Sequence, residues 1–323
     1  MRLRNKLAIA AALVAAALLV VVAWIAYDTD VLVRGEFARQ LHAAGLTKQT
    51  RTVAGHRWVY AERAGSDANA PTLVLVHGFT GSKENFYPLA RALDSRYRLV
   101  IPDLPGWGES ERLPRENYGY LAQSERLAAF IHAVSSDKPV VLVGHSMGGG
   151  IVALVAAGHP ERVSRVALLD ASGVRFKDNR FGEQVLAGHN PFGVHDRKSL
   201  DGYLHILFHD EAKQPGIPWP ADTAYIARRT HDAAFEQSVL DHIGRGPERF
   251  LPGDEAARIR QPALLLWCRQ DQVIDPSALA LYAARIPQAR RVMLDGCGHM
   301  SLVERPDAVA AAIQSLIAEG RPR

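Results

Sequence analysis

The chain has 323 residues, a formal net charge of +4 at pH 7 and a sequence pI near 9.1. This length accommodates one sizeable α/β domain with appendages. The small positive charge favours contact with anionic lipid. The sequence shows no arginine-rich run with interleaved aromatic side chains, so we do not expect a nucleic-acid partner.

The first 27 residues predict a membrane anchor. Three basic residues within the first six positions precede Leu7–Tyr27, a run without a charge. As a helix this run reaches roughly 32 Å, enough to span the hydrocarbon core of a bilayer. Small-residue sites such as Ala15–Ala17 leave a cleaved signal peptide as the alternative, but the apolar region of a signal peptide is usually shorter. We expect an uncleaved single-pass transmembrane helix, with a cytoplasmic N-terminus and the following domain on the exoplasmic side, which is periplasmic in a bacterium.

Residues 28–48 predict a juxtamembrane amphipathic helix. Val33, Phe37 and Leu41 share one face at helical spacing, and Gly45 is suited to end the helix. This face either packs on the domain or lies at the level of the lipid headgroups. The anchor and this helix also offer a surface for pairing between two copies of the chain, so a homodimer stays open.

The remaining chain predicts an α/β core interrupted by one long insertion. The expected strands are an antiparallel pair at 50–54 and 57–62, followed by apolar runs at 72–77, 98–102, 139–143, 163–169, 262–267 and 290–294. Strands that alternate with helices indicate a mostly parallel sheet with helices on both faces. We expect the core to comprise residues 49–173 and 259–323, with residues 174–258 as a helical cap or lid.

The loop after strand 72–77 supplies a candidate for stabilising negative charge. Gly78 lets the backbone turn inward, and the backbone N–H of Phe79 is one predicted donor of an oxyanion hole. The Phe79 side chain is free to form a wall of an acyl pocket as well. We interpret His77 and Asp103, each at the end of a strand, as structural residues.

The central motif is Gly144-His-Ser-Met-Gly148, between the β-rich run 140–143 and an alanine-rich helical pattern. A G-x-S-x-G sequence in this context is typical of a sharp strand-to-helix turn that exposes a nucleophilic serine. Ser146 is therefore the candidate nucleophile. The backbone N–H of Met147, at the start of the helix, is the second predicted oxyanion donor.

The predicted cap is rich in aromatic and aliphatic side chains. Residues 200–208 indicate a mostly apolar helix, and a helical cap over the site would create a pocket suited to an acyl chain. The same side chains also suit the cap's own core, and the sequence does not separate the two roles. His205 and His209 have metal-binding spacing but no acidic partner motif, so we expect no metal site.

A serine nucleophile needs a base and a group that orients the base. His299 follows the last predicted strand and is the candidate base, while Asp271 follows strand 262–267 and is the candidate acid. Asp170, at the end of another strand, stays open as an alternative acid, and Asp275 is more typical of a helix cap.

Two cysteines, Cys268 and Cys297, flank these candidates. A disulfide between them is conceivable in an exoplasmic domain, but we favour two buried free thiols. Neither cysteine indicates a catalytic thiol.

Together these residues resemble the α/β-hydrolase superfamily, and most of all its membrane-anchored monoacylglycerol lipases and related bacterial phospholipases A. The resemblance rests on LVHGFTGSKENF (75–86), IPDLPGWGES (101–110), VGHSMGG (143–149), WCRQDQVID (267–275) and GCGHMSLVERP (296–306). It implies an eight-stranded hydrolase sheet, a triad of Ser146, Asp271 and His299, and oxyanion donors at Phe79 and Met147. Cys268 is a departure, because such families usually carry glycine there.

The resulting expectation is a membrane-anchored serine hydrolase of monoacylglycerol or (lyso)phospholipid esters, without a metal or organic cofactor. The alternatives are a carboxylesterase, thioesterase or carbon–carbon bond hydrolase for small substrates on the same fold. A catalytically silent lipid-binding scaffold is a third class, disfavoured by the complete set of site residues.

Overall fold

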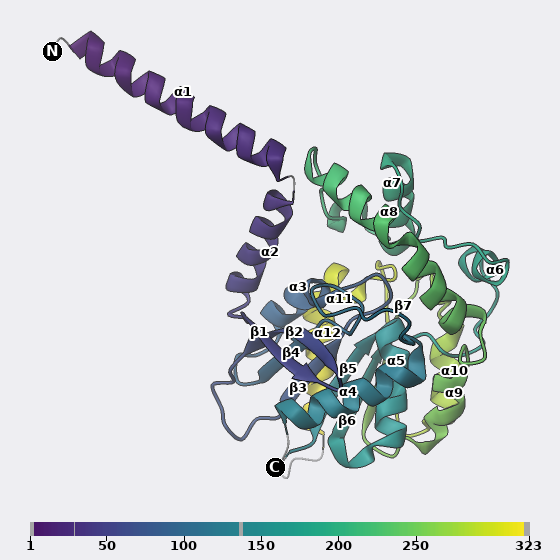
Figure 1. The fold of residues 1–323 in the computed structure, drawn as a ribbon. Coiled ribbons are helices and arrows are strands. Elements are labelled where there is room, and N and C mark those ends of the chain that lie inside the picture. Colours follow the sequence, from purple (N-terminus) through teal and green to yellow (C-terminus); the bar gives the residue numbers. More distant parts are fainter. Residues whose placement is uncertain (1–2, 29, 136–137, 320–323) are drawn as a thin grey trace.

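The computed structural model describes residues 3–28, 30–135 and 138–319. Its centre is one eight-stranded sheet with the order β1-β2-β4-β3-β5-β6-β7-β8 (Figure 1). The strands are β1 Thr47–Val53, β2 His56–Arg63, β3 Thr72–Val76, β4 Arg98–Pro102, β5 Val140–His145, β6 Val163–Leu169, β7 Ala263–Cys268 and β8 Arg290–Leu294. β2 pairs antiparallel with both neighbours, and the pairs from β4 to β8 are parallel. The predicted mostly parallel sheet is confirmed.

The sheet is buried on both faces because its central strands are mostly apolar. Val74 and Val76 of β3 belong to the core on one face, whereas Leu73 and Leu75 belong to the core on the other. The first face is covered by α4 (Tyr120–Val134) and α5 (Met147–Gly158), and the second by α3 (Tyr87–Ala92) and α12 (Pro306–Ala318). This arrangement leaves the carboxyl ends of the parallel strands free to carry a site.

The predicted cap, residues 174–258, is mainly helical. It contains α6 (Arg180–Leu186), α7 (Arg197–Leu207), α8 (Ala221–Leu240) and α9 (Leu251–Glu255), and α7 and α8 extend beyond the core (Figure 1). The expected helix at 200–208 corresponds to α7, which begins at Arg197 and ends at Leu207, so Phe208 lies just beyond it. Within α8 the guanidinium of Arg229 donates to the carboxylate of Glu236 at 2.7 Å, and both side chains are buried. The same guanidinium donates to the carbonyl of Phe192 at 2.7 Å, which joins α8 to the segment before α7. The domain boundaries themselves stay a prediction.

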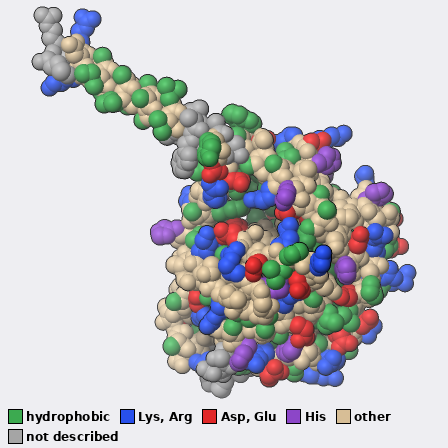
Figure 2. Space-filling view, viewed as in Figure 1, with side chains coloured by type: hydrophobic (Ala, Val, Ile, Leu, Met, Phe, Trp, Pro, Cys, Tyr) green, Lys and Arg blue, Asp and Glu red, His purple; other side chains and the backbone are tan. Residues whose placement is uncertain are grey.

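Two helices precede the sheet. α1 (Leu3–Tyr27) points away from the domain, and α2 (Val31–Ala43) connects it to β1 (Figure 1). Several large apolar side chains of α1 are exposed, among them Leu7, Leu13 and Leu19 (Figure 2). Within the described part of the chain, no helix has the length and apolarity needed to cross a membrane. The prediction of a transmembrane helix over residues 7–27 is therefore not supported by this criterion.

Candidate active site

Ser146 occupies a sharp turn between β5 and α5. Its backbone angles, φ of 55° and ψ of −121°, lie outside the regions that residues other than glycine ordinarily adopt. A Cβ at Gly144 would lie 2.3 Å from the carbonyl oxygen of Gly148, and a Cβ at Gly148 would lie 2.4 Å from that of His77. The motif thus needs both glycines for close backbone contact. Met147 is the first residue of α5, as expected for an amide that faces a developing oxyanion.

The structure brings His299 and Asp271 together. Nδ1–H of His299 donates to Oδ2 of Asp271 at 2.8 Å, and both side chains are buried. Oδ1 of Asp271 accepts the backbone amides of Val273 and Ile274 at 2.8 and 3.0 Å. With Nδ1–H engaged in this way, Nε2 carries the free lone pair of the neutral imidazole.

The two competing carboxylates have other partners. Asp170 accepts the amide of Cys268 at 2.9 Å and the hydroxyl of Ser301 at 2.5 Å. Asp275 accepts the amide of Ser277, the first residue of α10 (Ser277–Arg285), at 2.9 Å. These contacts give Asp170 and Asp275 structural positions, and of the three carboxylates Asp271 is the one that His299 bonds.

Burial favours the neutral forms of the pair. It lowers the pKa of His299 from 6.5 to about 3. Burial likewise raises the pKa of Asp271 well above its usual value, although the amides of Val273 and Ile274 act in the opposite direction. An imidazole that is neutral at pH 7 is ready to accept a proton.

His145, the residue before Ser146, joins the nucleophile turn (residues 144–148) to the base turn (residues 295–300). Its Nε2–H donates to the carbonyl oxygen of His299 at 2.7 Å, and the two rings lie 4.8 Å apart. Burial lowers the pKa of His145 to about 3, which keeps this donor in its neutral form. Sequence reasoning missed His145, although its place within the Ser146 motif was a usable signal.

The oxyanion loop (residues 77–82), which follows β3, carries the predicted oxyanion donor Phe79. It lies directly against Ser146. A Cβ at Gly78 would be 2.8 Å from Cβ of Ser146. His77 fixes the loop, because its Nδ1–H donates to the carbonyl of Gly78 at 2.8 Å while its Nε2 accepts the amide of Leu104 at 3.0 Å. The structural role predicted for His77 agrees with these bonds, and the backbone of Phe79 follows next in the chain.

The Phe79 side chain meets aromatic residues of the core and of the cap. Its ring centroid lies 5.3 Å from that of Trp107 and 6.1 Å from that of Phe192. Trp107 in turn lies 4.9 Å from Phe235 of α8. An aromatic wall therefore extends from the oxyanion loop into the cap, as expected for an apolar pocket.

A disulfide connects the acid and base sides of the site. Cys268 and Cys297 are bonded, with their Cα atoms 5.4 Å apart, so the expectation of free thiols is wrong. Parallel pairing of β7 with β8 places the two strand ends side by side, which sequence spacing did not reveal. Beside this bond, Arg269 pairs with Asp295 at 2.5 Å.

A buried charge cluster lies at Lys83, directly after the oxyanion loop in the chain. Nζ of Lys83 lies 2.9 Å from Asp103, 2.8 Å from Glu84 and 2.8 Å from Glu109. Lys83 and Asp103 are almost fully buried, so each compensates the charge of the other. Asp103 has the structural position that we predicted, whereas sequence reasoning did not identify Lys83.

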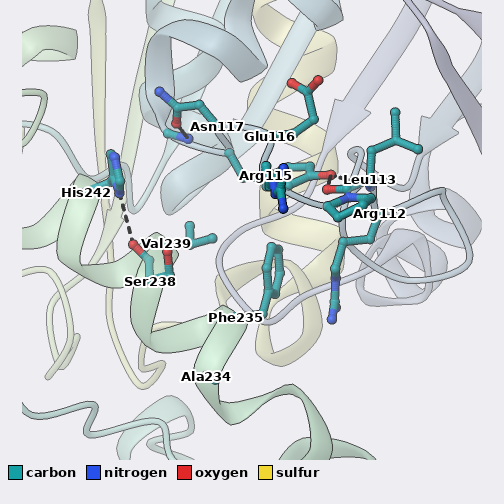
Figure 3. A pocket seen from close by; sticks show the side chains of 13 residues that line it. Arg112, Leu113, Arg115, Glu116, Asn117, Ala234, Phe235, Ser238, Val239 and His242 are labelled. Atoms are coloured by element: carbon teal, nitrogen blue, oxygen red, sulfur yellow. Dashed lines mark hydrogen bonds between the residues drawn. The ribbon is translucent and has the colours of Figure 1, made fainter.

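A separate cavity of about 510 Å³ lies between residues 112–119 and α8 (Figure 3). Arg112, Phe235 and His242 are among its lining residues, whereas none of the predicted site residues lines it. Phe235 and Trp107 stand between this cavity and Phe79. It is therefore distinct from the space around Ser146. Within residues 3–28, 30–135 and 138–319, no group of three or more His, Cys, Asp or Glu side chains is placed to hold a metal ion.

Comparison with known proteins agrees with this geometry. A family model described as the alpha/beta hydrolase fold matches residues 71–306. Lipase 1 of Psychrobacter immobilis is 31% identical over 266 residues, covering 81% of each chain. Monoacylglycerol lipase abhd6-B of Xenopus laevis is 25% identical, covering 82% of this chain and 80% of its own. The crystal structure of a membrane phospholipase A, described as a bacterial virulence factor, superposes with a TM-score of 0.83 at 32% identity, covering 94% of this chain and 96% of the other.

Proposed function

The chain belongs to the alpha/beta hydrolase fold family as a serine ester hydrolase, and we propose that it hydrolyses the carboxylic ester bonds of membrane lipids, monoacylglycerols or (lyso)phospholipids. The observation that carries the proposal is the buried His299–Asp271 pair, joined through His145 to the strained turn at Ser146. The similar lipases and the membrane phospholipase A support a lipid as the ester.

In the proposed reaction, Nε2 of His299 accepts the Ser146 proton as the hydroxyl attacks the ester carbonyl. The tetrahedral oxyanion accepts hydrogen bonds from the amides of Phe79 and Met147, and such a donor is worth about 2.7–4 kcal/mol in other enzymes. His299 then protonates the departing alcohol. Water, activated by the same imidazole, releases the fatty acid from the acyl-enzyme. These residues complete the reaction without a metal or organic cofactor.

The aromatic wall supports a substrate with an acyl chain. Phe79 and Phe192 bring an apolar surface from the oxyanion loop and the cap to one place, and Gly78, the residue before Phe79, lies against Ser146. An acyl chain against these rings would leave water and bury apolar area in proportion to its length. We therefore expect turnover to favour longer acyl chains over acetyl esters.

We further propose that α1 and α2 attach the enzyme to a bilayer, with the N-terminus cytoplasmic and the catalytic domain exoplasmic. The uncharged run at 7–27 and the exposed apolar side chains of α1 support attachment. The Cys268–Cys297 disulfide supports an oxidising compartment. The same two helices are the proposed contact of a homodimer, since Leu32 of α2 is also exposed.

Labelling with a fluorophosphonate probe tests the catalytic assignment. We expect labelling of the wild-type protein and its loss in Ser146→Ala; absence of labelling in folded wild-type protein would favour a silent lipid-binding scaffold. A hydrolysis panel across acyl length and headgroup, in mixed micelles, then tests the substrate class. Turnover of short water-soluble esters alone would contradict a lipid substrate.

Removal of residues 1–27 tests the membrane assignment. We expect the full chain to sediment with vesicles and the shortened protein to stay in the supernatant, while both hydrolyse a soluble ester equally. Chemical cross-linking of the two forms tests the homodimer, which should be lost on removal of the helix. Sedimentation of both forms alike would contradict attachment through α1.

A further inference from the structure

Glu304 is a buried carboxylate that lies between the base turn and the cap. It ends α11 (Ser301–Glu304) and is 3% exposed. Its Oε2 accepts the amide of Gly298 at 2.7 Å, and its Oε1 accepts the amides of His209 and Asp210 at 3.0 and 2.8 Å. One side chain therefore binds the residue before His299 and the segment that follows α7.

Three backbone amides directed at one carboxylate make a strong, geometrically specific contact. Hydrogen bonds to an ionised acceptor are roughly twice as strong as those between neutral groups, and they compensate for the burial of the charge. The two oxygens of Glu304 have separate partners, Gly298 on one side and the cap segment on the other. The carboxylate thus acts as a bridge between two parts of the chain.

A second contact joins the same two segments. The amide of Met300 donates to the carbonyl of Leu207, the last residue of α7, at 3.2 Å. A Cβ at Gly298 would lie 2.8 Å from the amide nitrogen of His209, so the backbones are in close contact. Of the two residues that flank His299, Met300 is thus bonded to the cap directly, and Gly298 is linked to it through Glu304.

The same helix also contacts the other half of the site. The hydroxyl of Tyr203 in α7 lies 3.2 Å from that of Thr80, the residue after Phe79. A displacement of α7 would therefore act on both the base turn and the oxyanion loop. The contact through Glu304 is the more direct of the two, because Gly298 adjoins His299.

We propose that Glu304 is a positioning residue that couples the cap to the catalytic base. With the cap in place, Glu304 holds the amide of Gly298 and keeps His299 aligned with Ser146. Displacement of residues 207–210 removes partners of Glu304 and loosens the base turn. The inference rests on the proposed function, which assigns the base role to His299.

The variant Glu304→Gln tests this coupling. Glutamine has one acceptor oxygen, so it can accept either the cap amides or the Gly298 amide. On the other side its NH₂ group faces a backbone N–H, and two donors cannot form a hydrogen bond. We expect kcat to fall between about tenfold and 100-fold, because small misplacements of a catalytic group have effects of this size. The loss should be equal for acetyl and long-acyl 4-nitrophenyl esters, with KM nearly unchanged.

Glu236→Gln is the matched control. It weakens the buried ion pair with Arg229 inside the cap but leaves the contacts of Glu304 untouched. We expect this control to affect long-acyl esters, which need the cap, more than acetyl esters. If Glu304→Gln behaved in the same manner, Glu304 would only shape the acyl pocket, and the coupling would be refuted.

Amide hydrogen exchange of the wild-type protein provides a test that needs no variant. Coupled segments should open together, so the amides of Gly298, His209 and Asp210 should share one exchange rate. Exchange of the two cap amides about 100-fold faster than that of Gly298 would overturn the proposal. If instead His299→Ala retained wild-type turnover, the proposed function itself would fail, which distinguishes the two outcomes.

Discussion

The nucleophile turn and the base turn meet at one edge of the sheet, but different forces hold them. The nucleophile turn is fixed by close backbone packing, because Gly144, Gly148 and Gly78 leave no room for a side chain. The base turn depends on individual side chains, namely His145, Glu304 and Cys268. The first arrangement rests on the close approach of backbone segments, whereas the second rests on the partners of single side chains.

The largest expected effect concerns the base side. Asp271→Asn turns an acceptor into an amide that faces Nδ1 of His299, which favours the wrong tautomer. We expect kcat to fall about 10⁴-fold, as the equivalent change does in other Ser-His-Asp hydrolases. Steady-state kinetics on a soluble ester measures this loss.

Asp275→Asn and Asp170→Asn are the comparisons for that experiment. Asp275 accepts an amide at the start of α10, so its replacement should leave kcat within a few fold of wild type. A loss in Asp170→Asn as large as in Asp271→Asn, with Asp271→Asn still active, would reassign the acid.

The next effect concerns the nucleophile side. In Gly78→Ala the new Cβ would lie 2.8 Å from Cβ of Ser146, so the oxyanion loop must move. We expect kcat to fall about 10²–10³-fold, the usual effect of losing one oxyanion donor. Gly202→Ala in α7 is the control, because nothing lies within 4 Å of its Cβ. Equal activity of the two variants would contradict the close packing of the loop.

Removal of the disulfide sharpens the comparison on the base side. The double variant Cys268→Ala, Cys297→Ala opens a link across a sequence separation of 29 residues. We expect the free energy of unfolding to fall by about 3 kcal/mol, measured by chemical denaturation. Activity should fall less than in Asp271→Asn, because the hydrogen bond between His299 and Asp271 remains. A variant as stable as the wild-type protein would show that the other bonds suffice.

The last effect is confined to acid pH and concerns the stability of the nucleophile side. Burial lowers the pKa of His77 from 6.5 to about 4, so the unfolded chain binds the proton more readily. Stability contributed by neutral His77 is therefore complete above pH 6.5 and falls by roughly 3 kcal/mol as the pH drops through 4. In His77→Gln, the free energy of unfolding measured by chemical denaturation should fall less steeply between pH 6.5 and pH 4 than in the wild-type protein. Replacement of the exposed His242 by glutamine is the control, and an equal change in both variants would contradict the assignment.

The contrast between the two turns also explains what could be predicted from sequence. The strands and Ser146 were predictable because hydrophobic periodicity and glycine spacing are local properties. The sequence made Asp271 the candidate acid but left Asp170 open, since both residues follow strands of one sheet, and the contact with His299 distinguishes them. The disulfide and the bonds of Glu304 join segments far apart in the chain, and no local pattern encodes such partners.

The backbone of Ser146 has a consequence for how this lineage of proteins can change. A positive φ in a residue with a side chain costs on the order of 1–3 kcal/mol, and glycine would avoid most of that cost. Selection for catalysis must therefore act continuously against a more stable alternative at this position. A descendant that no longer needed hydrolysis would become more stable through the single substitution Ser146→Gly. Inactive members of the lineage should therefore carry glycine where this chain carries serine.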